Sequence, residues 1–303
     1  MRTRSWRQLL VEAATRLRAA GVESPEVDAR RIGEEASGRT GAALVLHIDG
    51  AVTEPQLAQF EAMVARRVAG EPLQYVLGRW GFRTLDLLVD RRVLIPRPET
   101  EQVVEAALGE LERVVHSSRA GGDRVESTSN RRRAKIVDLG CGSGAIGLSI
   151  AAECEGVDVW CVDASADAIA VCNDNLAALD LARSQVTVVH GSWFDALPPD
   201  LTGQLDLVIA NPPYVATYDD LPDEVADWEP TRALVAGPTG LEAIAHIVDH
   251  APEWLSADGV LVSEIGATQA RQAGAAARRA GFLDVEIRPD LAGRDRTLIA
   301  RRT

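Results

Sequence analysis

Residues 135–150 read KIVDLGCGSGAIGLSI, a short apolar strand that runs into a glycine-rich turn and then into a helical pattern. The glycines let the backbone turn tightly and approach a ligand without a Cβ in the way. A second apolar run, VDVWCVD at residues 157–163, ends in the carboxylate of Asp163. In a doubly wound sheet this acid lies beside the glycine turn, where it can accept both hydroxyls of a ribose. The two segments predict a cofactor site whose candidate residues are Asp138, Gly140, Cys141, Gly142, Ser143, Gly144 and Asp163.

NAD would fit this much of the pattern. The glycine spacing is G-x-G-x-G, however, and no downstream segment is typical of a hydride-transfer site. Asp138 and Asp163 also allow a plainer interpretation, as ordinary acids at the ends of strands. The order of strand, turn, helix and strand around them favours the cofactor site.

A tetrapeptide of different chemistry, Asn211-Pro212-Pro213-Tyr214, directly follows the apolar run LDLVIA at residues 205–210. Proline has no backbone donor and pushes the residue before it out of the helical region, so the Asn211 side chain and nearby carbonyls are held outward as acceptors. Two acceptors beside an aromatic face suit a flat nitrogen that carries two hydrogens. We therefore predict a pocket for an amide or amino group. A proline-rich turn that merely ends a strand is the alternative.

The region from residue 99 to 303 alternates helical and extended patterns, which predicts an α/β fold with a doubly wound, mostly parallel seven-stranded sheet. The last two strands are close enough in sequence to form an antiparallel pair at the sheet edge. The candidate site residues fall at the carboxyl ends of the first four strands, where open α/β sheets bind ligands. The strands are expected at residues 135–139, 157–162, 186–190, 205–210, 259–264, 283–287 and 296–301.

Residues 1–70 predict a small helical bundle. A helix that starts near Trp6 is stopped by Gly21, a second begins at Pro25 after Ser24, and a third is opened by the capping-box pattern at Thr53. Residues 71–98 contain extended runs at 80–82, 85–89 and 93–95 and predict a β-hairpin connector between the bundle and the sheet domain.

The composition narrows the class of protein. The net charge is −13 and the pI is near 4.9, whereas a protein that binds duplex nucleic acid by itself tends to be basic. The arginine cluster at 131–133 is interpreted as a solvated loop. No apolar run approaches 18 residues, so no membrane span is expected, and the N-terminus has no signal-peptide pattern. The four cysteines form no C-x-x-C pair, which favours free thiols in a reducing cytosol and no metal site.

With these motifs in this order, the chain resembles a class I S-adenosylmethionine-dependent methyltransferase that acts on an amino or amide nitrogen. Further segments resemble the HemK/PrmC family, the methyltransferases of a glutamine side-chain amide in peptide chain release factors. The resemblance covers residues 5 to about 301. It is carried by EPLQYVLG at 71–78, WGF at 80–82, VLIPRPETE at 93–101, WEP at 228–230, EIG at 264–266 and DLAGRDR at 290–296.

The resemblance implies S-adenosylmethionine as cofactor, a release factor as protein partner, and transfer to N5 of the glutamine in a Gly-Gly-Gln loop. It also implies substrate docking by the bundle and a cover over the adenine ring by Trp193, although Trp193 could equally fill the core. Asn211, Pro212 and Tyr214 are then the catalytic candidates, Pro213 a further substrate contact, and Asn211 also a cofactor contact. Arg97 is interpreted as an ion-pair partner of Glu99 or Glu101, with a place in the cofactor pocket as the alternative.

Two rival functions remain. A nucleic-acid methyltransferase acting on adenine N6 or guanine N2 can use the same pocket, because an exocyclic amine is also a flat group with two hydrogens. The acidic charge and the lack of a basic target-recognition segment count against it. A non-catalytic cofactor-binding protein is the second rival, but it has no reason to retain Asn211.

Overall fold

The computed structural model describes residues 4–120, 132–179, 181 and 185–303 of the 303-residue chain. The chain divides into two compact units. Unit 1 contains Met1–Trp80 and Pro222–Trp228, and unit 2 contains Gly81–Leu221 and Glu229–Thr303.

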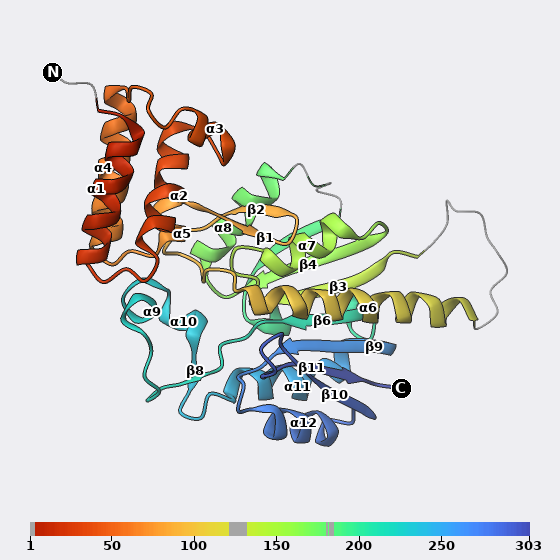
Figure 1. Ribbon diagram of the computed structural model, residues 1–303. Helices are drawn as coiled ribbons and strands as arrows, with labels where there is room; N and C mark the ends of the chain where they lie inside the picture. Colours follow the sequence, from red (N-terminus) through yellow and green to blue (C-terminus); the bar gives the residue numbers. More distant parts are fainter. Residues whose placement is uncertain (1–3, 121–131, 180, 182–184) are drawn as a thin grey trace. The chain divides into compact units, whose positions relative to one another are not determined.

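Unit 1 is a helical bundle (Figure 1), and its three predicted helices are confirmed as α1 (Trp6–Ala19), α2 (Pro25–Ser37) and α4 (Glu54–Val68). Thr53 caps α4 through a capping box with Gln56, as its sequence pattern indicates. The rings of Trp6 and Phe60 pack edge to face, 5.8 Å apart, in the bundle core. The short helices α3 (Ala42–Leu46) and α5 (Leu73–Leu77) were not predicted, because five residues are too few to show a helical period.

A distant segment joins this bundle. Helix α9 (Asp223–Trp228) belongs to unit 1, although the residues on either side of it in sequence belong to unit 2. The buried Arg67 guanidinium explains the attachment, since it lies 2.8 Å from Asp28 Oδ2 and 3.0 Å from Glu224 Oε1 of α9. Sequence periodicity cannot reveal an ion pair between residues 157 positions apart.

Unit 2 contains the predicted seven-stranded sheet, with strand order β10-β11-β9-β6-β3-β4-β5. The strands β9, β6, β3, β4 and β5 are mutually parallel, and β11 is antiparallel to both β9 and β10. The predicted antiparallel pair at the sheet edge is thus confirmed. The bounds are β3 Ala134–Leu139, β4 Val157–Asp163, β5 Val186–His190, β6 Leu205–Ala210, β9 Leu255–Glu264, β10 Asp284–Pro289 and β11 Asp295–Arg301.

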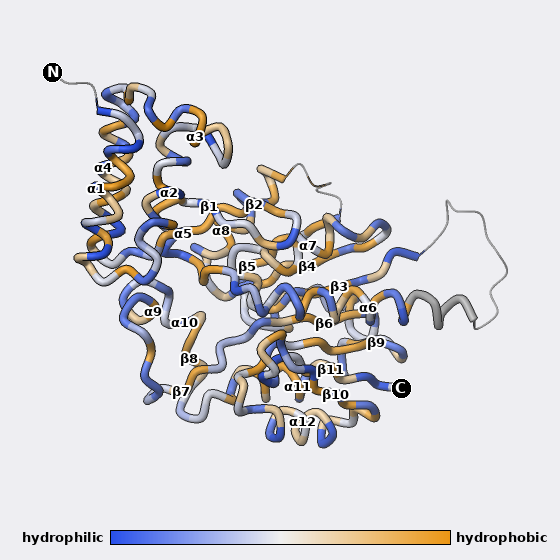
Figure 2. Tube along the Cα trace, viewed as in Figure 1, coloured by the Kyte–Doolittle hydropathy of each residue, from blue (hydrophilic) through white to orange (hydrophobic). Residues whose placement is uncertain are grey.

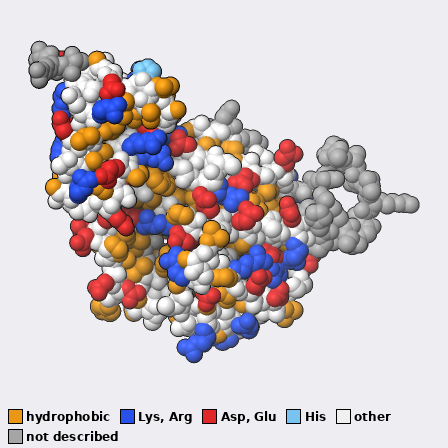
Figure 3. All heavy atoms as spheres, in the orientation of Figure 1, with side chains coloured by type: hydrophobic (Ala, Val, Ile, Leu, Met, Phe, Trp, Pro, Cys, Tyr) orange, Lys and Arg blue, Asp and Glu red, His pale blue; other side chains and the backbone are white. Residues whose placement is uncertain are grey.

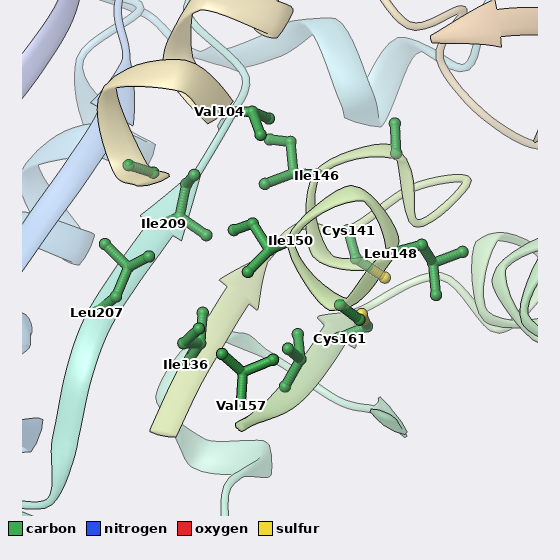
Figure 4. Packing of buried hydrophobic residues seen from close by; sticks show 14 of the residues in the cluster. Val104, Ile136, Cys141, Ile146, Leu148, Ile150, Val157, Cys161, Leu207 and Ile209 are labelled. Atoms are coloured by element: carbon green, nitrogen blue, oxygen red, sulfur yellow. The ribbon is translucent and has the colours of Figure 1, made fainter. Parts of the chain in front are cut away.

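Both faces of the sheet are covered by helices, and the central strand β6 is buried at every residue. Figure 2 shows hydrophobic residues along the strands of this sheet. Ile136 and Leu207 face α6 (Pro98–Ala120), α7 (Ala145–Glu153) and α8 (Ala166–Ala178), and Figure 4 shows this cluster. Their neighbours Val137 and Val208 face α11 (Glu242–Trp254) and α12 (Ala270–Arg279). Because β3, β4, β5, β6 and β9 run parallel, the loops that follow them all leave the sheet at the same carboxyl edge.

The expected connector is only partly a hairpin. Strands β1 (Arg79–Phe82) and β2 (Leu85–Leu88) form a two-stranded sheet, and the boundary between the units falls after Trp80. The extended run at 93–95 does not pair as a strand of this hairpin. It follows a turn at residues 90–93, in which the Val93 N–H donates to the Asp90 carbonyl and the Asp90 carboxylate accepts from the Arg92 N–H.

The remaining elements of unit 2 are short. They are the 3-10 helices η1 (Trp193–Ala196) and η2 (Pro199–Leu201), the strands β7 (Val215–Ala216) and β8 (Val235–Gly237), and the helix α10 (Thr231–Leu234). Among the described residues, no helix combines the length and the apolar character that a membrane span requires.

Acidic and basic side chains are interspersed on the face of the molecule drawn in Figure 3. Two members of the arginine cluster are engaged in ion pairs: Arg132 lies 2.5 Å from Asp206 and Arg133 lies 2.6 Å from Asp158. The third, residue 131, lies outside the described residues, as does most of the segment before it. Arg132 and Arg133 therefore carry neutralised charge on the sheet domain.

Candidate active site

A cavity of about 330 Å³ opens in unit 2 at the carboxyl edge of the sheet. This is the size range of small-molecule sites, and it lies where a doubly wound sheet places them. Six predicted site residues line it: Gly140, Gly142, Asp163, Trp193, Asn211 and Pro213. Three further lining residues, Val93, Leu94 and Pro230, belong to segments that carried the family resemblance but had no assigned site role. The other lining residues are Arg92, Val162, Ala164, Ser165, Ala168, Gly191, Arg232 and Ala233.

Asp163 ends β4 and is fixed by the main chain on both sides. Its Oδ2 accepts from the Gly142 N–H at 2.9 Å and its Oδ1 accepts from the Ser165 N–H at 2.8 Å. Burial raises the pKa of this carboxyl, while the two N–H groups oppose the rise. Each carboxylate oxygen keeps a second lone pair, so Asp163 can still accept hydroxyl groups from the cavity.

Two glycines of the turn differ in the space that surrounds them. Gly142 has φ +54°, and a Cβ added there would meet nothing within 4 Å, so its open side suits a closely approaching ligand. Gly144 has φ +84°, but its added Cβ would lie 2.7 Å from the Leu148 side chain and 2.8 Å from Cys172 Sγ. Gly144 therefore serves close packing of the turn on the helices.

Four predicted cofactor residues do not line the cavity: Asp138, Cys141, Ser143 and Gly144. Asp138 is fully buried beneath the turn, where its Oδ2 accepts from the Gly147 N–H at 2.9 Å. Burial raises the pKa of Asp138 to about 8. Asp138 therefore does not face the cavity; it stabilises the first turn of α7 from below the glycine turn. Asn175 of α8, which the sequence did not single out, donates to the Ser143 carbonyl at 2.9 Å and fixes the turn from the other side.

Trp193 combines the two interpretations left open by the sequence. It lines the cavity, with its ring 3.7 Å from the position of a Cβ on Gly140, and it also packs partly buried against the core cluster that contains Val137 and Val208. Its φ of +45° is unusual for a bulky residue, and such a conformation persists only where the surroundings impose it. The indole is thus held at the cavity wall.

On the acceptor side of the cavity, Asn211 directly follows β6. Its Nδ2 donates to Thr100 Oγ1 at 3.2 Å, and Thr100 Oγ1 lies 2.6 Å from Glu264 Oε2. Burial raises the pKa of Glu264, while the Thr100 hydrogen bond and the Arg296 charge oppose the rise. Neither Thr100 nor Glu264 had a predicted role.

Pro212 and Tyr214 stand beside the cavity but do not line it. The Tyr214 carbonyl accepts from Gln269 Nε2 at 2.9 Å, and the Arg296 guanidinium lies 5.8 Å from the centroid of the Tyr214 ring. Burial raises the pKa of the Tyr214 hydroxyl, which therefore stays protonated at neutral pH. The tetrapeptide is anchored at its far end by residues from the last third of the chain.

Arg97 forms an ion pair, as interpreted, but with a different partner. Its Nη2 lies 2.6 Å from Glu229 Oε1, and Glu229 also accepts from the Ile95 N–H at 3.2 Å. Glu99 instead pairs with Arg294 at 2.9 Å. Both partners come from distant segments that the family resemblance included, and only the fold shows which acid meets which base. Among the described residues, no group of three or more His, Cys, Asp or Glu side chains is placed to hold a metal.

Comparison with known proteins agrees with this geometry. Residues 8–78 match the family described as PrmC N-terminal domain, and residues 125–226 match the methyltransferase small domain. The chain is 37% identical over 297 residues to the release factor glutamine methyltransferase of Rhodospirillum rubrum, covering 97% of this chain and 84% of that protein. It is 38% identical over 299 residues to the protein of the same name from Moorella thermoacetica, covering 98% of each.

Among solved structures, the catalytic domain of hMettl16 in complex with MAT2A 3'UTR hairpin 6 is similar with a TM-score of 0.52. It is 13% identical, and the match covers 83% of each chain. That likeness shows the methyltransferase fold alone. The two matches cover 97% and 98% of this chain and therefore include both its bundle and its sheet domain. On this evidence the chain belongs to the release factor glutamine methyltransferase family.

Proposed function

We propose that this protein transfers a methyl group from S-adenosylmethionine to the side-chain amide nitrogen, N5, of a glutamine in peptide chain release factors. One observation carries the proposal beyond the names of the relatives. Asn211 lines the same cavity as Asp163 and Gly142. Its Nδ2 donates to Thr100, which leaves Oδ1 available to accept a hydrogen bond from the substrate.

The cavity fits S-adenosylmethionine on its own chemistry. Asp163 offers carboxylate lone pairs to a ribose, Gly142 presents main chain without a Cβ, and Trp193 offers an aromatic wall to a purine. When bound, this cofactor supplies an electrophilic methyl group on a sulfonium.

A carboxamide nitrogen is a poor nucleophile, because its lone pair is delocalised into the carbonyl. The protein must therefore supply alignment and charge stabilisation. In the proposed mechanism Asn211 Oδ1 and the Pro212 carbonyl accept the two amide hydrogens, and the Tyr214 ring packs on the amide plane and excludes water. As nitrogen gains positive charge, these acceptors bind its hydrogens more tightly than in the ground state, which is the differential binding that catalysis requires. The methylated amide is acidic and then loses one of these hydrogens as a proton to water or to an accepting carbonyl.

The proposal extends to the partner and the compartment. Residues 1–70 dock the release factor, the protein acts in the cytoplasm where translation terminates, and it forms no stable complex with nucleic acid of its own. The net charge of −13 supports the last point, because a duplex-binding surface needs to neutralise phosphates.

The test is a transfer assay with S-adenosylmethionine labelled in the methyl group. Purified release factor, the same factor with its Gly-Gly-Gln glutamine changed to alanine, total RNA and DNA are the four acceptors. Label is expected only in the unchanged release factor. Label in RNA or DNA would favour the nucleic-acid rival, and absence of label from all four would favour the non-catalytic one.

A further inference from the structure

Three residues from distant parts of unit 2 form one hydrogen-bonded chain behind the acceptor side of the cavity. Asn211 Nδ2 lies 3.2 Å from Thr100 Oγ1, which lies 2.6 Å from Glu264 Oε2. Thr100 is 3% exposed and Glu264 is 1% exposed, so water offers neither an alternative partner. The chain runs away from the cavity into the interior.

The sheet register explains why these residues meet. Strands β6 and β9 are parallel neighbours in which Ala210 pairs with Ser263, so Asn211 and Glu264 both come one residue later. Ile209 and Val262, two residues before them, belong to the core cluster that contains residues of α6. Because side chains alternate along a strand, Asn211 and Glu264 return to that same face. Thr100, in the first turn of α6, lies there to meet both.

The chemistry of the three groups gives the chain a direction. An asparagine amide has an acceptor end and a donor end of nearly equal size, so packing alone does not decide which end faces the cavity. When Glu264 is ionised, its carboxylate can only accept, and it therefore takes the single hydroxyl hydrogen of Thr100. What remains on Thr100 is a lone pair, and only the donor end of Asn211 can use it.

We propose that Thr100 and Glu264 are positioning residues that orient the Asn211 amide with Oδ1 toward the substrate nitrogen. This inference rests on the function proposed for Asn211. In the opposite orientation, the N–H donors of Asn211 would face the N–H donors of the substrate amide. The pair would then repel where the reaction needs attraction, and the rate would fall without any change in the shape of the pocket.

The groups around Glu264 make the chain sensitive to pH. Glu264 faces Thr100, Tyr214, Arg296 and Glu99; burial and the Glu99 charge raise its pKa, and the other three groups lower it. When Glu264 binds a proton, its hydroxyl can donate to Thr100, and Thr100 can then donate to Asn211. Protonation thus releases the orientation, and turnover is expected to fall toward acid pH.

The experiment uses the full-length protein with release factor as acceptor. Thr100→Val removes the hydroxyl at nearly constant volume, Thr100→Ser keeps it, and Thr297→Val is the matched control. Thr297 is a buried threonine on β11 that pairs with Glu264 across the sheet but lies outside the chain of three. We expect Thr100→Val to lower kcat by about tenfold or more. The affinity for S-adenosylmethionine should change by less than about twofold, because only the contact of Asn211 with the substrate amide in the transition state is weakened.

Thr100→Ser is expected to keep kcat within about threefold of the wild type, and Thr297→Val within about twofold. The fall of kcat toward acid pH should be present in the wild type and in Thr100→Ser, and absent in Thr100→Val. Thr100→Ala, which removes the hydroxyl without crowding the carboxylate, replaces Thr100→Val if that variant does not fold.

Equal kcat in Thr100→Val and Thr100→Ser, with an active wild type, would overturn the inference. A wild type that does not methylate release factor would instead overturn the proposed function. The side-chain NH₂ resonance of Asn211 then tests the chain alone. It is expected to exchange faster with solvent in Thr100→Val than in Thr100→Ser, and equal exchange would refute the orientation by Thr100.

Discussion

The two sides of the active site are built in different ways. The cofactor side consists largely of main chain: the glycine turn follows β3 within a few residues, and the Asp163 carboxylate is held by two backbone N–H groups. The acceptor side consists of side chains, with Asn211, Thr100 and Glu264 drawn from three segments more than 50 residues apart. The cofactor side can be predicted from a local sequence motif. On the acceptor side the sequence predicts only Asn211, because its partners Thr100 and Glu264 are distant in the chain.

The largest effect is expected on the acceptor side. Asn211→Ala removes the acceptor that holds the substrate amide hydrogens in the transition state. It should raise the barrier by about 2–4 kcal/mol and leave cofactor affinity nearly unchanged. Steady-state kinetics and a direct binding measurement with the cofactor separate the two quantities. Undiminished kcat would refute the role of Asn211, and a parallel loss of cofactor affinity would show that the two sides are not independent.

Next in size is the packing of the glycine turn, which can be compared within one loop. Gly144→Ala meets both an unfavourable positive φ and close contacts at 2.7 and 2.8 Å, so it should lower the free energy of unfolding by about 2–3 kcal/mol. Gly142→Ala meets only the φ penalty, about 1 kcal/mol, but places a methyl group on the open side of the turn. Urea denaturation of both variants checks the difference, and equal losses would contradict it.

A smaller effect is expected from the ribose-binding acid. Asp163→Asn replaces one acceptor oxygen by a donor, which must face either the Gly142 or the Ser165 N–H, and it also removes lone pairs offered to the cavity. Cofactor affinity should weaken by about tenfold, or ~1.4 kcal/mol, while kcat at saturating cofactor stays within about threefold. Calorimetric titration measures the affinity. A loss confined to kcat would assign Asp163 to the wrong side of the site.

A separate effect, on the pH dependence of stability, concerns Asp138 beneath the turn. Its carboxyl has a pKa of about 8 in the folded protein against 3.8 for the unperturbed group, so between these values the folded protein holds a proton that the unfolded chain has released. The contribution of Asp138 to stability is therefore fully present below pH 4 and is lost as the pH rises toward 8. The slope is at most about 1.4 kcal/mol per pH unit.

Asp138→Asn keeps the shape of the side chain and removes this titration. Urea denaturation is measured at about pH 5 and about pH 7.5, two points between the unfolded and the folded pKa. The variant should lose less stability with rising pH than the wild type. An identical pH dependence in the two proteins would show that Asp138 is ionised beneath the turn, and would contradict the raised pKa.

Much of the fold could be read from local patterns. All seven strands of the large sheet and the three long helices of the bundle follow from periodicity, capping residues and glycines. The errors lie where local signals are weak or where a partner decides. Helix α5 is too short to show a period, residues 93–95 do not pair as a strand, and α9 joins unit 1 through Arg67.

The amino-acid sequence by itself determined the order of strands and helices, the glycine turn, Asp163 and the tetrapeptide at 211–214, because each of these depends on neighbours within a few residues. Only the tertiary structure decided that Arg97 pairs with Glu229, that Asp138 lies beneath the turn, and that Thr100 and Glu264 stand behind Asn211. The physical reason is that hydrogen-bond direction and burial depend on which distant groups the sheet register brings within about 3 Å of one another.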